Sequence, residues 1–423
     1  MASRVKPRNL FLALFILAVV LLLIPFSAHR AAKGSSDFDV YYYAGKALLN
    51  GAPIYSVDGK AATLSQSPFL YPPFFACVIS PFSFFSIATA AGLWNILNFL
   101  FMVGSGIVLT RSFFYSLNGL FRQSFRLIAL RITFLLFIIL ICLDNLAMAQ
   151  INPAVFFFLV FAFECVLRKK DTAAGISLAG AIAMKLIPLI FLPYFILKQK
   201  WRLVTSCLVS LICFFWLFPS LSVGFQKNLE YYDAFQRSVE GQRTPVKLPF
   251  YASQLSPSHQ NLQSVLFRLS IDWDFREHTG GPNGRAFVFR TPIRFSEKTA
   301  SEIAIASVIL LLIAGFYLIS RSRMNDSQCL QEISFVLILM FLSAPKMRSH
   351  GFIYLVFPLM YLAEQCLSKN KNTKTIQKIF FMSAFFYLLQ GIKYFKFLGA
   401  GCFSALILLV YFGKELMNQE KRT

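Results

Sequence analysis

Long apolar stretches alternate with short polar segments along almost the whole chain. A helix needs about 20 apolar residues to cross a bilayer, and many of these stretches approach that length. Basic residues gather between the stretches in short runs such as Arg168-Lys169-Lys170. Because Lys and Arg are enriched on the cytoplasmic side of membrane helices, these runs orient each span. The pattern therefore predicts an all-α, polytopic membrane protein of about 12 transmembrane helices.

Most predicted spans are simple crossings. The first apolar run, residues 10–26, follows basic residues as a signal peptide would, but its length and the apolar chain behind it favour an uncleaved first span. The simple crossings are expected at residues 10–27, 88–110, 132–148, 154–167, 203–218, 300–320, 331–345, 351–367, 379–394 and 398–413.

Two proline-containing regions do not fit simple crossings. The first third of residues 71–110 contains Pro72-Pro73 and Pro81, so we expect a re-entrant or tilted piece there. Residues 173–197 lie between two basic runs that both belong on the cytoplasmic side. Two half-spans broken at Lys185 to Pro188 satisfy this requirement, and such broken helices occur where the backbone lines a cavity.

Two polar segments remain outside the membrane on the outer side. They are residues 28–70 and 219–298, and both are long enough to hold short helices. We find no internal repeat and no soluble domain. The sequence thus predicts a single membrane-embedded domain that covers residues 1–423, with helical extracytoplasmic loops.

Composition agrees with this interpretation. The chain is 57% hydrophobic and 14% charged, whereas a soluble protein carries about 25% charged residues. The net charge of +22 could suggest nucleic-acid binding, but apolar spans interrupt the basic runs, which excludes a continuous basic face. The eight cysteines lie in or beside apolar segments, so we interpret them as small hydrophobic residues and not as a disulfide or metal framework.

The predicted topology brings polar clusters that are distant in the sequence to the outer side, as an embedded active site would require. Lys185 can reach the same side from the tip of its broken hairpin. The clusters are Asp37 and Asp39; Tyr71; Gln150 and Asn152; Asn261, Gln263 and Ser264; and Lys346, Arg348 and His350.

Asp37 lies just beyond the first predicted span. A carboxylate there can take a proton from an acceptor hydroxyl as a general base. The same segment can also begin a helix, with Ser36 or Asp37 as its N-cap, and neighbouring Tyr41 can belong to an interfacial aromatic belt. Both interpretations stay open at this stage.

Two further positions carry cations where they are costly or unexpected. Lys185 lies in a strongly apolar stretch, where a charge either binds a ligand such as a lipid phosphate or extends to the nearer interface. Lys346, Arg348 and His350 share an outer turn, which suits a phosphate better than the positive-inside pattern, although a solvated turn is the alternative. Zinc-ligand spacings and glycine-rich phosphate loops are absent from the sequence.

Several short segments resemble, in order, the motifs of glycosyltransferase family 87, a group with the GT-C architecture. They are the segment that starts at Asp37-Phe38-Asp39-Val40-Tyr41, Tyr71-Pro72-Pro73, Gln150-Ile151-Asn152, the segment 174–202 around Lys185, Asn261-Leu262-Gln263-Ser264, and the segment 343–350. The chain departs from the family pattern at Ala149, where Gly is usual, and at Arg348, where Trp is usual.

The resemblance implies a transferase that moves a sugar, with mannose favoured, from a polyprenyl-phosphate donor to a glycolipid or glycan acceptor. Asp37 would be the general base of an inverting displacement. Lys185, Arg348 and His350 would bind the donor phosphate. We expect no metal or other cofactor, no nucleic-acid partner, and a multi-pass location in the inner (plasma) membrane. The remaining substrate-binding residues would be Asp39, Tyr41, Tyr71, Gln150, Asn152, Asn261 and Gln263.

Two other hypotheses compete with an enzyme. A transporter or flippase of a lipid-linked saccharide would also use broken helices and an intramembrane lysine, but its polar residues should be spread over both faces. Here they gather on one face, and a single long outer loop covers residues 219–298. A subunit without catalysis would not need Asp37. The enzyme hypothesis is favoured.

Overall fold

The computed structural model describes residues 24–33, 36–55, 68–116, 141, 143–241, 256–274, 288–291, 294–322, 326–367 and 373–420. Regular structure in this part of the chain is helical except for one antiparallel pairing of two residues each, β1 (Trp273–Asp274) with β2 (Val288–Phe289). The all-α prediction is therefore confirmed for these ranges.

The chain divides into two compact units, each described here by itself. The first comprises Met1–Thr110, Ile139–Pro188 and Arg202–Gly241, and the second comprises Arg111–Ile138, Leu189–Trp201 and Gln242–Thr423. The sequence predicts that the whole chain forms a single domain. This depends on how the two units join, and it stays a prediction.

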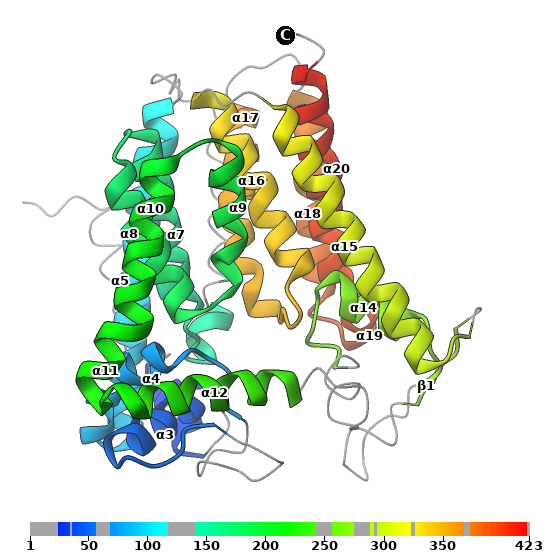
Figure 1. The fold of residues 1–423 in the computed structure, drawn as a ribbon. Helices are drawn as coiled ribbons and strands as arrows, with labels where there is room; N and C mark the ends of the chain where they lie inside the picture. The colour runs from blue at the N-terminus through cyan, green and yellow to red at the C-terminus, as the bar shows by residue number, and fades with distance from the viewer. Residues whose placement is uncertain are drawn as a thin grey trace, which may run out of the picture. The chain divides into compact units, whose positions relative to one another are not determined.

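The first unit holds a helical hairpin beside several other helices (Figure 1). The hairpin pairs α7 (Asn152–Leu167) with α8 (Asp171–Met184), and Pro153 suits the first turn of α7, where no backbone N–H is needed. The other helices are α2 (Ile24–Ala32), α3 (Phe38–Leu49), α4 (Pro73–Ile79), α5 (Ile87–Ser116), α10 (Trp201–Ile212), α11 (Phe218–Val223) and α12 (Phe225–Gly241).

A glycine sets the distance between α8 and α10. A Cβ atom on Gly175 would lie 2.4 Å from the Leu203 carbonyl oxygen and 2.8 Å from the Cys207 nitrogen, which is too close for any side chain. Ser206 of α10 also donates to the Thr172 carbonyl at 2.9 Å. Small residues allow this kind of close helix packing in membranes.

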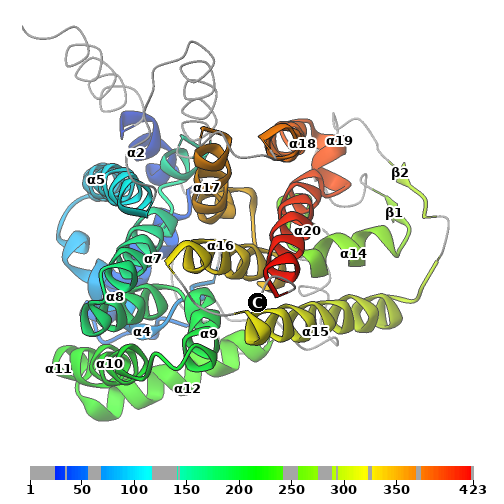
Figure 2. The same ribbon diagram turned by 90° about the horizontal axis from the view of Figure 1, so that it is seen from above.

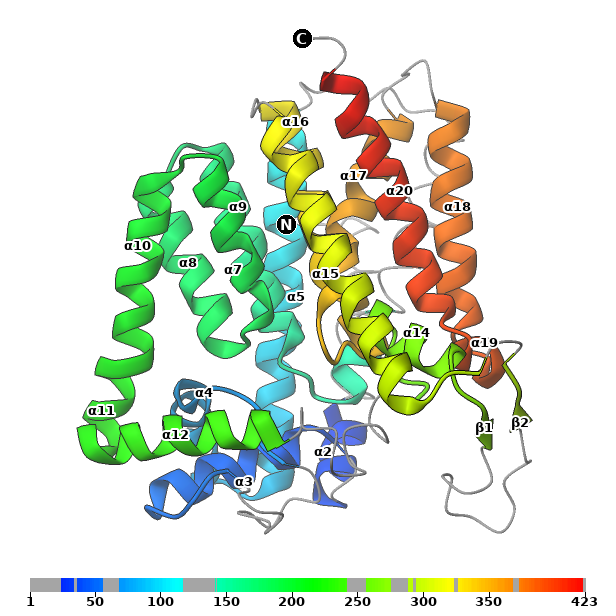
Figure 3. The same cartoon turned by 45° about the vertical axis from the view of Figure 1, so that its right-hand side comes forward.

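An asparagine side chain replaces a missing backbone hydrogen bond where α10 continues into α11. A π-helical turn, Cys213–Leu217, joins the two helices and precedes Pro219. Pro219 has no N–H for the carbonyl four residues before it, which is that of Phe215. Asn228 of α12 supplies this bond with an Nδ2–O distance of 3.0 Å. The bond ties α12 to the π-helical turn, and α12 runs crosswise to α10 (Figure 3).

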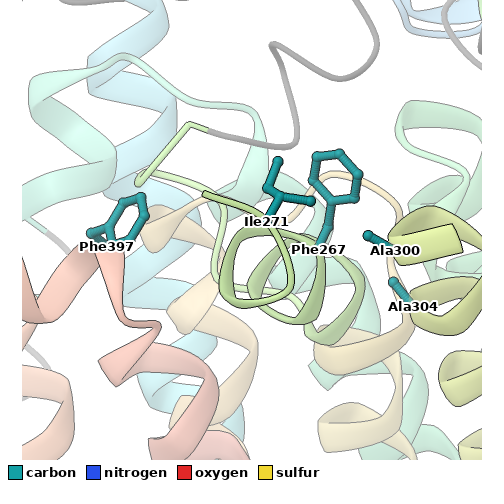
Figure 4. Close-up of a cluster of buried hydrophobic side chains, with 5 residues drawn as sticks. All are labelled: Phe267, Ile271, Ala300, Ala304 and Phe397. Atoms are coloured by element: carbon teal, nitrogen blue, oxygen red, sulfur yellow. The ribbon is translucent and has the colours of Figure 1, made fainter. Parts of the chain in front are cut away.

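The second unit is built mainly from long helices (Figure 2). Phe267 and Ile271, in and just after α14, pack with Ala300 and Ala304 of α15 and with Phe397 of α19 (Figure 4). The helices are α9 (Phe191–Leu197), α14 (Leu262–Leu269), α15 (Glu297–Arg321), α16 (Asp326–Ser343), α17 (Val356–Leu367), α18 (Thr373–Leu389), α19 (Lys393–Phe397) and α20 (Ala400–Glu420), with a 3-10 helix at Ser349–Leu355.

A buried ion pair fastens α9 within the second unit. Lys198 donates to Glu332 of α16 with an Nζ–Oε1 distance of 2.8 Å, and their side chains are 5% and 0% exposed. Lys198 also donates to the carbonyl oxygens of Ile319 and Ser322, at the end of α15. Tyr194 donates to the second oxygen of Glu332 at 3.0 Å. The pair is therefore surrounded by the protein's own polar groups.

Four helices in the described ranges are long and apolar enough to cross a membrane: Ile87–Ser112, Trp201–Val223, Glu297–Arg321 and Ala400–Asn418. The predicted break at Lys185 is confirmed, because α8 ends at Met184 and Lys185 has extended backbone angles. The piece after Tyr71 is the short helix α4 followed by a 3-10 turn, Ser80–Phe84. Most of the predicted spans 10–27 and 132–148 lies outside the described residues. The count of twelve helices stays a prediction.

Candidate functional site

In the first unit, one turn connects most of the predicted site residues. This turn, residues 150–152, lies directly before and at the start of α7. The side chain of Gln150 donates to the Asp37 carboxylate, the backbone of Ile151 bonds to the Tyr41 hydroxyl, and Asn152 accepts from Lys185. Three neighbouring residues thus contact two separate chain segments, the start of α3 and the break after α8.

Asp37 occupies the N-cap position of α3, but its side chain makes no capping hydrogen bond. Its carboxylate Oδ2 instead accepts from the amide of Gln150. Its backbone N–H donates to the Met148 carbonyl at 3.3 Å, so the main chain is also held against the turn. Asp37 remains half-buried, whereas Asp39 is buried. Of the two carboxylates, Asp37 is the more accessible to a substrate.

Tyr41 and Tyr71 form a hydroxyl pair beside Asp37. Their Oη atoms are 3.0 Å apart, and Tyr41 is buried while Tyr71 is partly exposed. Burial raises the pKa of Tyr41 well above its ordinary value, and the nearby Tyr71 and Asp37 raise it further. Tyr41 therefore stays a neutral hydrogen-bonding group at any physiological pH.

Lys185 lies at the end of the α7–α8 hairpin that carries the 150–152 turn. Its Nζ donates to Asn152 Oδ1 at 2.8 Å, and Asn152 Nδ2 donates to Asn145 Oδ1 at 3.2 Å. The basic turn Arg168-Lys169-Lys170 lies at the opposite end of α7, a helix of 16 residues. At 1.5 Å per residue, about 24 Å separates the two ends.

In the second unit, two chain segments pair edge to edge. The backbone N–H of Gln260 donates to Met347 at 2.7 Å, and that of Ser349 donates to Ser258 at 3.1 Å. The buried Asn261 donates to the Pro345 carbonyl at 3.4 Å. The pairing brings Asn261 to the turn that carries the predicted cations.

The three basic side chains of the turn at residues 346–350 differ in their exposure to solvent. Arg348 is exposed, Lys346 is partly exposed, and His350 is buried at the start of the 3-10 helix. Burial, together with the charge of Arg348, lowers the pKa of Lys346 to about 8. Gln263 lies nearby in sequence on α14 and is partly exposed. These positive groups can attract an anion without a compensating carboxylate on the turn itself.

The structure brings six predicted residues together in the first unit and assigns four others to the second. Whether Asp37 and His350 meet around one carrier stays a prediction. The first group is Asp37, Tyr41, Tyr71, Gln150, Asn152 and Lys185, and the second is Asn261, Gln263, Arg348 and His350, while Asp39 is buried in α3. Among the described residues, no cluster of three His, Cys, Asp or Glu side chains could hold a metal ion.

Sequence analysis missed several residues that hold these groups in place. In the first unit, Trp94, Asn95 and Asn98 of α5 donate to backbone carbonyls of residues 146–150. In the second, the buried Arg268 donates to the carbonyls of Ser256 and His259, and burial lowers its pKa to about 10. Two asparagines within an apolar stretch were a usable signal, because polar groups in such helices are costly.

The chain is similar to known proteins over much of its length. A family model, glycosyltransferase family 87, matches residues 69–345. Two relatives are each named polyprenol-phosphate-mannose-dependent alpha-(1-2)-phosphatidylinositol mannoside mannosyltransferase. The one from Mycobacterium tuberculosis is 29% identical over 217 residues, which are 49% of this chain and 50% of the relative. The one from Mycolicibacterium smegmatis is 33% identical over 173 residues, 38% of each protein.

No solved structure matches the chain. The chain spans about half the length of the curated relatives it matches, or less. The family match includes the 150–152 turn and Lys185, while Asp37 precedes it and His350 follows it. Since the match covers well over half of the 423 residues, the chain belongs to glycosyltransferase family 87.

Proposed function

We propose that this chain transfers mannose from a polyprenyl-phosphate donor to a glycolipid or glycan acceptor at the extracytoplasmic face of the inner (plasma) membrane. The observation that carries the proposal is the contact of half-buried Asp37 with Gln150, next to the contact of Lys185 with Asn152. The reaction needs a base and a cation, and the 150–152 turn contacts both of these groups. The names of the mycobacterial relatives support mannose and the lipid-phosphate carrier.

The proposed sidedness follows from charge. The basic turn Arg168-Lys169-Lys170 favours the cytoplasm under the positive-inside rule, and the site lies at the other end of α7. About twelve helices in one domain would then surround the site, as the sequence predicts. Because nucleotide sugars are cytoplasmic, a site on the outer side needs a donor carried by a lipid.

In the proposed reaction, Asp37 acts as the general base. An acceptor hydroxyl oxygen forms a bond to the anomeric carbon while the bond from that carbon to the phosphate oxygen breaks. The hydroxyl proton goes to Asp37, and the polyprenyl phosphate leaves with the electron pair of the broken bond. A single displacement of this kind inverts the configuration. Gln150 stabilises the charged form of the base, because it donates a hydrogen bond to the carboxylate.

The cations would stabilise the leaving phosphate. We assign this role to Lys185, Arg348 and His350, since charge-assisted hydrogen bonds to phosphate are short and strong. No metal or other cofactor takes part in the proposal. The substrate-binding residues would be Asp39, Tyr41, Tyr71, Gln150, Asn152, Asn261 and Gln263.

The test is turnover in proteoliposomes supplied with radiolabelled polyprenyl-phosphate mannose and a glycolipid acceptor. Asp37→Asn should lose at least ~100-fold in turnover, because general-base catalysis contributes about 10²–10⁴-fold. Asp233→Asn is the matched control, since Asp233 is an exposed carboxylate on α12 of the same unit. Equal turnover by wild type and Asp37→Asn would refute the assigned base. Passage of a lipid-linked saccharide across the bilayer without glycosyl transfer would favour the flippase hypothesis.

A further inference from the structure

One face of α5 carries three polar side chains that bond to the chain just before α7: two reach the turn at residues 149 and 150, and the third reaches Leu146 in the helical segment before it. Trp94 Nε1 donates to the Ala149 carbonyl at 3.0 Å, Asn95 Nδ2 to Leu146 at 3.0 Å, and Asn98 Nδ2 to Gln150 at 2.8 Å. The three donors are 2%, 1% and 0% exposed, so these bonds form away from solvent. Residues 94 and 98 are one helical turn apart and therefore share a face of α5.

The turn needs outside partners because of its conformation. It leaves helical geometry before α7 begins, and Ala149 has φ 49°, a left-handed value that costs a non-glycine residue about 1–2 kcal/mol. Carbonyls in such a turn lack the bonds that a helix supplies, and leaving buried carbonyls unpaired is costly. The α5 side chains supply these bonds, and they thereby hold a strained backbone in one position.

We infer that Asn98 is a positioning residue for the reaction, acting through Gln150 on Asp37. Asn98 fixes the carbonyl of Gln150, whose side-chain amide donates to the Asp37 carboxylate. The backbone of Asp37 bonds to Met148 in the same turn. The inference rests on the proposed function. The position of Gln150 matters for the reaction only if Asp37 is the general base.

Buried polar side chains of α5 bond either within their own helix or to a distant chain segment. Ser105, on the same helix and also buried, shows the alternative, because it donates at 2.8 Å to Phe101 of its own helix. Asn98 differs from Ser105 because its bond reaches residue 150, which is 52 residues away in sequence. Ser105→Ala is therefore the matched control for changes at Asn98.

The experiment measures kcat/KM against pH in proteoliposomes for Asn98→Leu, Gln150→Ala, the double variant and Ser105→Ala. Loss of a hydrogen bond to a carboxylate favours its protonated form, so the acid limb should move to higher pH by ~1 unit for the first two variants. Each should lose about 10-fold or more at neutral pH. Ser105→Ala should keep the wild-type profile. If the pH limb of Asn98→Leu does not move, the inference is wrong.

The double variant tests whether the two residues act through each other. If Asn98 acts through Gln150, the double variant is no slower than Gln150→Ala alone, whereas independent roles give multiplied losses. Should Asn98→Leu fail to fold, Asn98→Ser replaces it, because the shorter hydroxyl cannot reach the Gln150 carbonyl. Asp37→Asn is measured in the same series: its full activity would overturn the proposed function. Inactivity of Asp37→Asn with multiplied losses in the double variant would overturn this inference alone.

Discussion

Two lysines, Lys185 at the break after α8 and Lys198 at the end of α9, have different surroundings. Lys198 has a carboxylate at 2.8 Å and two carbonyls within 2.9 Å, and its side chain is 5% exposed. Lys185 is partly exposed and donates to the neutral amide of Asn152. A buried cation that has a carboxylate partner supports packing, whereas a partly exposed cation is accessible to an anionic ligand.

The comparison teaches that hydropathy does not separate a charge buried in an ion pair from one proposed to bind a ligand. Both lysines flank the same apolar segment, and both are costly where they lie. The partners decide the role. Glu332 and the end of α15 neutralise Lys198 within the second unit, and the 150–152 turn holds Lys185 beside the proposed base in the first.

The largest effect should come from breaking the buried pair. Lys198→Met leaves the buried Glu332 without its cation, which should destabilise the protein by about 3–5 kcal/mol. Thermal unfolding in detergent measures the loss. The double variant Lys198→Met with Glu332→Leu should be more stable than Lys198→Met alone, because no uncompensated charge remains. A single variant as stable as wild type would contradict the structural role of the pair.

Lys185→Met should affect activity more than stability. Removal of one charged hydrogen bond to the leaving phosphate should lower kcat/KM about 100-fold, which corresponds to about 2.7 kcal/mol. The thermal midpoint should stay within a few degrees of wild type. Turnover and unfolding are measured on the same preparation, with Lys198→Met as the opposite case. If Lys185→Met unfolds early and keeps its specific activity, the two lysines have been assigned the wrong way round.

The pH dependence of donor binding tests the role of a third lysine, Lys346. Burial and Arg348 lower its pKa from 10.5 to about 8, so it loses its proton as the pH rises from 7 to 9. If Lys346 attracts the donor phosphate, KM for the donor should rise about 10-fold over this interval. Lys346→Arg keeps its charge and should flatten the dependence. A wild-type KM that does not change between pH 7 and 9 would exclude a charged role for Lys346.

The sign of this pH effect separates binding from unfolding. The pKa of Lys346 is lower in the folded protein than in the unfolded chain, so the unfolded chain binds more protons between pH 8 and 10.5. The contribution of Lys346 to stability therefore rises with pH in that window. Deprotonation of Lys346 therefore does not favour unfolding. A KM that rises where the two pH ranges overlap cannot result from loss of the folded state through Lys346.

Some predictions from the sequence held because they depend on neighbouring residues. Apolar runs predicted the helices, and the break at Lys185 followed from the basic runs on both sides of it. Two explanations for Asp37 could not be separated, since an N-cap and a catalytic carboxylate look alike in sequence. In the structure, Asp37 occupies the cap position without making a capping bond, and its catalytic role stays a prediction.

The sequence alone determined the all-helical class, the break at Lys185 and the family, because these depend on local hydrophobic pattern and on short motifs. Only the tertiary structure decided which partner each polar side chain has. The Gln150–Asp37 contact joins residues 113 positions apart, and the Lys198–Glu332 pair joins residues 134 apart. Such pairings depend on how helices pack in three dimensions, which a periodic pattern does not encode.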